Sequence, residues 1–190
     1  MISMIIPCYW VNQQLFDMTL QCINTLIDTT EDEPNQILVI DDGSPNQEGI
    51  VDQSGLIQNI QTIHRNENGG YAAAVNTGLL YATGDIIIVC NNDIEFLNDE
   101  WLDYLTEPLK NGYDICSIRT TDADGWEVED YIEDSAKFGS IWAMKRKVYE
   151  TIGGLDESFG KGYFEDLDYQ KRAEDAAFRV GKNHAGIVEH

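Results

Sequence analysis

Short apolar runs alternate with longer amphipathic segments along this chain. The apolar runs predict strands at 2–8, 36–40, 59–64, 85–90, 114–118 and 139–144. The amphipathic segments predict helices at 13–28, 46–57, 71–82, 99–109, 145–151 and 164–178. This alternation is typical of parallel strands that are joined by crossover helices. The sequence therefore predicts an α/β fold with a mostly parallel central sheet flanked by helices.

The stretch from Asn66 to Asp93 contains the most informative pattern. It reads as a glycine-rich turn, a helix, a tight turn, a buried strand and then the carboxylate of Asp93. Gly69 and Gly70 are expected to leave backbone N–H groups open at the helix start, where a diphosphate could bind. Asp93 follows the carboxyl end of a strand, where ligands of open α/β sheets collect. A phosphate site and a metal carboxylate in one unit are typical of a nucleotide-sugar enzyme.

Length and charge narrow the possible functions. The chain has 190 residues, 43% of them hydrophobic, and we find neither a repeat nor a linker, so one domain over 1–190 is expected. The formal net charge is −22, which argues against binding nucleic acid or anionic lipid through a broad basic face. A divalent cation would locally overcome the repulsion between such a protein and a diphosphate.

The cysteines and the apolar runs indicate a cellular location. Single, widely spaced cysteines at 8, 22, 90 and 116 are expected to be reduced thiols. We recognise no signal peptide, and no apolar run approaches the roughly 20 residues of a spanning helix. We therefore expect a cytoplasmic protein with at most peripheral contact at the inner face of a membrane.

Two acidic residues close the second predicted strand. Asp41 and Asp42 are followed by Gly43 and Ser44, so one interpretation is an Asx turn or a helix cap. The other is that a carboxylate there accepts hydrogen bonds from a nucleobase or a ribose. Tyr9, just past the first strand, is either a packing residue or a ring on which the base stacks.

The turn Asn91-Asn92-Asp93 follows the buried strand. Its oxygen atoms suit Mg²⁺ or Mn²⁺, whose remaining ligands would be phosphate oxygens, although a simple polar turn is the alternative.

The predicted helix at 164–178 begins with Glu165 and Asp166. Acidic residues in a first turn commonly interact with the helix dipole, and Asp168 can pair with Arg172. A carboxylate at this place could instead take a proton from an attacking hydroxyl, if its pKa is raised.

Other classes of protein remain as alternatives. One is a nucleotide-sugar-binding module that has lost transfer activity. Another is a sugar nucleotidyltransferase, which is disfavoured because residues 7–14 contain neither glycine nor lysine. A dinucleotide-binding oxidoreductase is weaker still, because its glycine fingerprint is absent.

Taken in order, the motifs resemble a known family over nearly the whole chain. IIPCYW, DDGS, the NGG region, NND, GGLDE, EDLDYQKR and the final histidine resemble inverting family-2 glycosyltransferases with the Rossmann-like GT-A fold. The pattern NGG…N-x-G…A-x-GD…NND is most similar to the rhamnosyltransferase-like branch. Many members continue past the position of His190, so we expect either a minimal enzyme or a domain that is cut from a longer protein.

The resemblance implies a glycosyltransferase that moves a hexosyl or deoxyhexosyl unit. The donor would be a nucleotide-diphospho-sugar, with UDP or dTDP favoured, and the acceptor would be a glycan or a lipid-linked saccharide. Residues 1–95 would form the nucleotide-binding half, and residues 96–190 the half that binds the acceptor and carries the catalytic residues.

The same resemblance assigns roles to residues. Asp166 would be the catalytic base, with Glu165 beside it. Asp93 and His190 would hold Mn²⁺ or Mg²⁺, and Asn91 replaces the first acid of the family's metal motif. We expect weak acceptor contacts from Trp126 and Trp142. The expected contacts to the nucleotide-sugar are Pro7, Tyr9, Asp41, Asp42, Arg65, Asn68, Gly69, Gly70, Asn76, Asn91 and Asn92.

Overall fold

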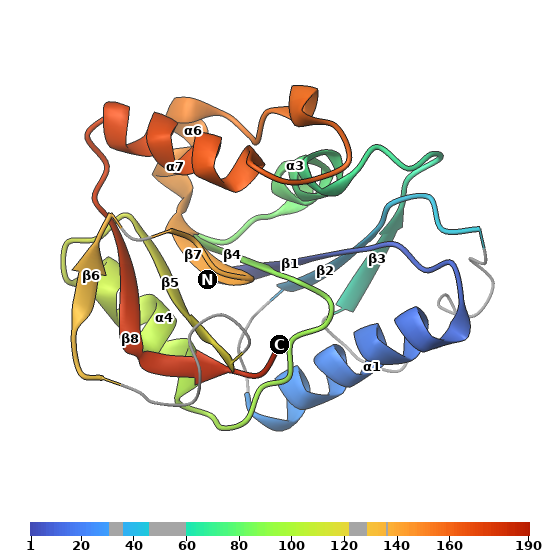
Figure 1. Ribbon diagram of the computed structural model, residues 1–190, viewed down its shortest axis with the longest axis horizontal. Helices are drawn as coiled ribbons and strands as arrows, with labels where there is room; N and C mark the ends of the chain where they lie inside the picture. The colour runs from blue at the N-terminus through green and yellow to red at the C-terminus, as the bar shows by residue number, and fades with distance from the viewer. Residues whose placement is uncertain (31–35, 46–59, 122–128, 136) are drawn as a thin grey trace.

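Figure 1 shows a computed structural model of the chain, which describes all residues except 31–35, 46–59, 122–128 and 136. Within the described residues the strands form one eight-stranded sheet in the order β3-β2-β1-β4-β7-β5-β8-β6. The strands are β1 (Ile2–Cys8), β2 (Gln36–Asp41), β3 (Ile60–His64), β4 (Ile86–Cys90), β5 (Ile115–Thr120), β6 (Ile132–Asp134), β7 (Ile141–Lys145) and β8 (Val180–Val188). The helices are α1 (Gln13–Asp28), α3 (Tyr71–Tyr81), α4 (Trp101–Lys110), α6 (Arg146–Ile152) and α7 (Glu165–Asp175), with a short 3-10 helix η1 (Glu157–Phe159).

The first half of the sheet is parallel. β1 pairs in parallel with β2 and β4, and β2 pairs in parallel with β3. β7 then runs antiparallel between β4 and β5, and β8 lies parallel to β5. The prediction of an α/β fold with a mostly parallel centre is confirmed, and β6 adds an antiparallel edge beside β8.

Helices cover both faces of the sheet (Figure 1). The helices α1 and α4 lie on one face, and α3, α6 and α7 lie on the other. Successive residues of β1 divide between the two resulting cores, because side chains alternate along a strand. Met4 and Ile6 pack with Leu26 of α1, whereas Ile5 packs with Leu79 of α3.

The start of α3 is packed closely against a distant loop. Gly70 has φ +89°, and a Cβ there would lie 2.6 Å from Cα of Lys161. Only glycine fits both the backbone angle and this approach. The N-terminus of α3 is thereby held against the segment that leads into α7.

Most of the predicted elements are confirmed, with boundaries shifted by a few residues. The predicted helix at 46–57 lies outside the described residues. The short strand β6 lies between the predicted strands at 114–118 and 139–144.

The strand β8 has no counterpart in the sequence prediction. It contains Lys182, Asn183 and His184, so its apolar alternation is weak. Asn183 is nevertheless buried, because its amide donates a hydrogen bond to the carbonyl of Tyr104 at 2.8 Å. A partner that is so distant in the sequence leaves no local signal.

All four cysteines are buried free thiols, as expected. In the described part of the chain, no helix has the length and apolar character that crossing a membrane requires. The expected cytoplasmic location stays a prediction.

Candidate active site

Two cavities lie next to each other beside the strand ends of the sheet. The small cavity has a volume of about 390 Å³ and the large cavity about 810 Å³. Tyr71 and Lys161 line both, so the two cavities meet at these residues. The small cavity is lined by Pro7, Cys8, Tyr9, Asp42, Asn68, Gly70, Tyr71, Ala74, Asn92 and Lys161. The large cavity is lined by Tyr71, Asn91, Thr120, Phe138, Gly139, Ser140, Trp142, Lys161, Gly162, Tyr163, Phe164, Glu165, Asp166 and Leu167.

The small cavity collects residues that follow three adjacent parallel strands. Tyr9 follows β1, Asp42 follows β2, and Asn92 follows β4. Parallel strands end at the same edge, which is why residues so far apart in the sequence meet here. Tyr9 is 41% exposed, so a ligand in the small cavity could reach its side chain.

The two acidic residues after β2 have different partners. Asp41 is fully buried, its Oδ1 accepts the N–H of Ser44 at 2.9 Å, and its Oδ2 bonds Nδ1 of His64 at 2.8 Å. Asp41 therefore fixes the turn and lines neither cavity. Of the two acids only Asp42 lines the small cavity, and its contact with a base or ribose stays a prediction.

The carboxylate of Asp42 occupies the N-terminus of α3. It accepts the N–H of Gly69 at 3.0 Å and that of Gly70 at 2.7 Å, and it also pairs with the guanidinium of Arg65. This corrects the expectation that these two N–H groups are open to a diphosphate. A carboxylate has about four acceptor positions, so Asp42 keeps one for a further donor.

The turn after β4 separates the two cavities. The backbone N–H of Asn91 donates to the carbonyl of Ser140 at 2.8 Å, and Asn91 lines the large cavity. The amide of Asn92 donates to Oγ1 of Thr19 at 2.7 Å, and Asn92 lines the small cavity. The predicted polar turn therefore contributes one residue to each cavity.

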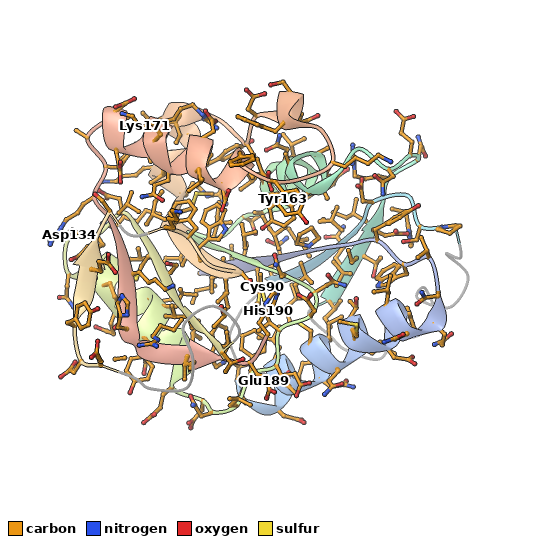
Figure 2. The ribbon with its side chains drawn as sticks, viewed as in Figure 1. Cys90, Asp134, Tyr163, Lys171, Glu189 and His190 are labelled. Carbon is orange, nitrogen blue, oxygen red and sulfur yellow. The ribbon has the colours of Figure 1, made fainter. Side chains whose placement is uncertain are left out.

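The structure brings Asp93 and His190 together. Nε2 of His190 lies 3.3 Å from Oδ1 of Asp93, and this buried oxygen accepts no hydrogen bond. An antiparallel bridge between Glu95 and Glu189 holds the chain end in place, with N–O distances of 3.0 and 3.1 Å. Figure 2 labels Glu189 and His190 at this end of the chain.

The pair is compatible with a divalent cation. A carboxylate oxygen without a hydrogen bond and an imidazole nitrogen are ligands that Mn²⁺ accepts. Among the described residues there is no group of three or more histidine, cysteine or acidic side chains that could hold a metal. Asp93 and His190 also line neither of the two cavities.

Glu165 and Asp166 both line the large cavity at the start of α7. Oδ1 of Asp166 accepts the N–H of Leu167 at 2.8 Å. Burial, together with the nearby charge of Asp166, raises the pKa of Glu165, whose Oε2 accepts no hydrogen bond. Tyr163 and Phe164, just before the helix, have φ of 78° and 75° (Figure 2 labels Tyr163). Such backbone angles are uncommon outside glycine and often occur at functional sites.

Asp168 has the structural role that the sequence offered as an alternative. Its Oδ2 accepts a hydrogen bond from Nε of Arg172 at 2.7 Å. The guanidinium of Arg172 also donates to the carbonyls of Ile152 and Gly154. Asp168 therefore fixes α7 against the preceding turn.

Aromatic side chains form one wall of the large cavity. Trp142 is buried and stacks on Phe138, with the ring centres 4.9 Å apart. Tyr71 lines the same cavity, and burial raises the pKa of its phenol, so the phenol stays neutral. The other expected acceptor residue, Trp126, lies outside the described residues.

Several predicted nucleotide contacts have other positions. The amide of Asn76 donates to the carbonyl of Leu155 at 2.9 Å and to Oε1 of Glu157 at 2.8 Å, and it accepts the N–H of Leu155. Asn76 therefore anchors the GGLDE turn, in contrast to the expected contact with a nucleotide. Gly69 and Arg65 support Asp42 and line neither cavity.

Sequence reasoning missed Tyr71, Phe138 and Lys161. The position of Tyr71 directly after Gly70 at a helix start offered a weak signal. Nothing local marks Phe138 or Lys161, because each reaches the site through contacts with distant segments.

The chain is similar to known glycosyltransferases in sequence and in fold. The chain is 30% identical over 132 residues to a dolichol-phosphate mannosyltransferase of Pyrococcus furiosus, covering 68% of this chain and 36% of that protein. A structure of GalNAc-T7 with UDP, GalNAc and Mn²⁺ has a TM-score of 0.83 at 13% identity, covering 100% of this chain and 43% of the other. A structure of the mannosyltransferase PcManGT of Pyrobaculum calidifontis with GDP-Man and Mn²⁺ has a TM-score of 0.80 at 16% identity. The match covers 100% of this chain and 56% of the other.

These solved structures show that the fold is GT-A. The chain spans between 30% and 36% of the length of the curated relatives that it matches. The model of the family described as "Glycosyl transferase family 2" matches residues 3–183. The chain therefore belongs to glycosyl transferase family 2.

Proposed function

We propose that this chain binds a nucleotide-diphospho-sugar and transfers its sugar to an acceptor hydroxyl with inversion at the anomeric carbon. The small cavity would take the nucleotide, and the large cavity would take the acceptor. The observation that carries the proposal is that the two cavities join at Tyr71 and Lys161, with Asp42 in one and Asp166 in the other. Sugar and acceptor can therefore meet at one point.

The division of the chain into halves supports this arrangement. Apart from Lys161, every residue that lines the small cavity belongs to the proposed nucleotide-binding half, 1–95. The large cavity takes most of its lining from 96–190. The base would stack on Tyr9 and donate a hydrogen bond to Asp42. UDP or dTDP is the nucleotide that the resemblance to the rhamnosyltransferase-like branch favours.

In the proposed step, Asp166 takes the proton of the acceptor hydroxyl. The acceptor oxygen then forms a bond to the anomeric carbon while the bond from that carbon to the phosphate oxygen breaks. The bonding electron pair leaves with the nucleoside diphosphate. Because attack and departure occur on opposite sides, the anomeric configuration inverts.

Asp93 and His190 would hold a divalent cation, Mn²⁺ or Mg²⁺. When bound, such an ion neutralises charge that develops on a leaving diphosphate. Two solved structures with this fold contain Mn²⁺ together with a nucleotide or a nucleotide-sugar, which supports this assignment.

The experiment compares Asp166→Asn with the wild-type protein. Each is incubated with UDP-glucose, UDP-GlcNAc, dTDP-rhamnose or GDP-mannose, with Mn²⁺ and a panel of glycan acceptors, and released nucleoside diphosphate is measured. Loss of the base should slow release about 10²- to 10⁴-fold, whereas nucleotide affinity should be retained. Asp175→Asn, an exposed acid on the same helix that pairs with Lys171, is the matched control. A wild-type rate in Asp166→Asn would refute the role of Asp166.

A further inference from the structure

Lys161 belongs to the glycine-rich segment that leads into α7. Gly160 and Gly162, its neighbours, have φ of +81° and +158°. The carbonyl oxygen of Lys161 lies 3.5 Å from the backbone nitrogen of Tyr71. The backbone of Lys161 also packs closely against Gly70. The backbone of Lys161 is therefore held against the start of α3.

This position puts the residue at the junction of the two cavities. Lys161 lines both cavities, and no other lysine or arginine is among the described residues that line either one. The guanidinium of Arg65, beside the small cavity, is paired with Asp42. Lys161, in contrast, forms no ion pair with another described residue.

The other charged groups that line the cavities are acidic. Asp42 lines the small cavity, and Glu165 and Asp166 line the large one. In a chain with a net charge of −22, these carboxylates would repel a diphosphate at the junction. A lysine ammonium is a compact charge that binds phosphate oxygens well.

We propose that Lys161 binds the diphosphate of the donor at the junction of the two cavities. This inference rests on the proposed function, because it requires the nucleotide to lie in the small cavity and the sugar to point toward the large one. The phosphate next to the sugar then lies beside Lys161. An ammonium at this place would also stabilise the negative charge that the leaving diphosphate gains as its bond to the sugar breaks.

The test measures dissociation constants by isothermal titration calorimetry with Mn²⁺ present. The ligands are UDP, dTDP and GDP, each paired with its monophosphate, and the variants are Lys161→Met and Lys161→Arg. We expect Lys161→Met to weaken binding of the diphosphate about tenfold and to leave binding of the monophosphate unchanged. Lys161→Arg keeps the charge and should retain most of the affinity.

Lys171→Met is the matched control, because Lys171 is exposed on α7, pairs with Asp175 and lines neither cavity. Equal diphosphate affinity in wild type and Lys161→Met would overturn the inference and leave the proposed function intact. Equal weakening of mono- and diphosphate would also overturn it, because it would indicate that the loop supports the nucleotide site as a whole. If the wild-type protein bound none of these nucleotides, both this inference and the proposed function would fail.

Discussion

At the scale of single residues, the two neighbouring acids of the site differ in their surroundings. Glu165 is only 7% exposed, and one of its carboxylate oxygens has no hydrogen bond. Asp166 accepts a backbone N–H and lines the large cavity. The acid with the raised pKa is thus Glu165, whereas Asp166 is the one that the family resemblance assigns as the base.

The raised pKa of Glu165 predicts a pH-dependent stability difference. Below the pKa of the unfolded chain, about 4.3, Glu165 is neutral in both states and its burial costs little. As the pH rises through the higher pKa of the folded state, a buried charge must form, so the wild type loses stability. Glu165→Gln should therefore gain thermal stability relative to wild type between pH 4 and pH 8, as differential scanning calorimetry would show.

Glu150→Gln, an exposed position on α6, provides the control and should show no such trend. A difference between Glu165→Gln and wild type that stays constant from pH 4 to pH 8 would contradict the burial argument.

The sequence predicted which residues follow the strands, but not how the acids after β2 divide their roles. Asp41 and Asp42 are chemically equivalent in the sequence. Their roles are decided by His64, which bonds Asp41, and by Gly69 and Gly70, which bond Asp42. Those contacts depend on the register of β2 with β3, which has no local signature.

At the scale of elements, α3 connects the packing of the core to the site. Its N-terminus carries Gly70 and Tyr71, and its middle packs on β1 through Gly78. A Cβ at Gly78 would lie 2.4 Å from Cγ2 of Ile5, a fully buried residue. The helix can therefore lie this close to the sheet only while residue 78 has no side chain.

Gly78→Ala should lower stability despite the better helix propensity of alanine. The propensity gain is about 1 kcal/mol, whereas overpacking of a core costs about 1–3 kcal/mol. The short branch of Ile5 cannot swing away, so we expect a net loss of about 1–2 kcal/mol in urea unfolding. In the double variant Gly78→Ala with Ile5→Ala the clash is absent. The loss of stability in the double variant should therefore be smaller than the sum of the losses in the two single variants. A stabilised single variant would show that α3 shifts freely on β1.

The parallel strands could be predicted from the sequence because each buried strand is a continuous apolar run, as β4 is. The strand β8 could not be predicted, because its buried polar residue Asn183 forms its hydrogen bond with a group that is distant in the sequence. The end of β8 carries Glu189 and His190 to the turn after β4, so the missed strand explains how the predicted partner of Asp93 reaches it.

At the scale of the whole molecule, the site joins segments that are far apart in the sequence. The resemblance to a family named Asp93, Asp166 and His190, but the shape of the cavities depends on how the loop at 160–164 packs on α3. That packing brings Lys161 to the junction and could not be predicted from any single segment. Because the chain has a net charge of −22, the affinity for a diphosphate should depend on the charged groups at this junction.

The central claim is that the strand ends bind a nucleoside diphosphate together with a divalent cation. The most direct measurement is a thermal-shift panel of UDP, dTDP and GDP, each with and without Mn²⁺. A ligand at 100 times its Kd stabilises the folded state by about 2.7 kcal/mol, which raises the Tm of a domain of this size by roughly 5–10 °C. We predict such a rise for at least one nucleoside diphosphate, and a smaller rise without Mn²⁺. A Tm that no nucleotide changes, with or without Mn²⁺, would contradict the account.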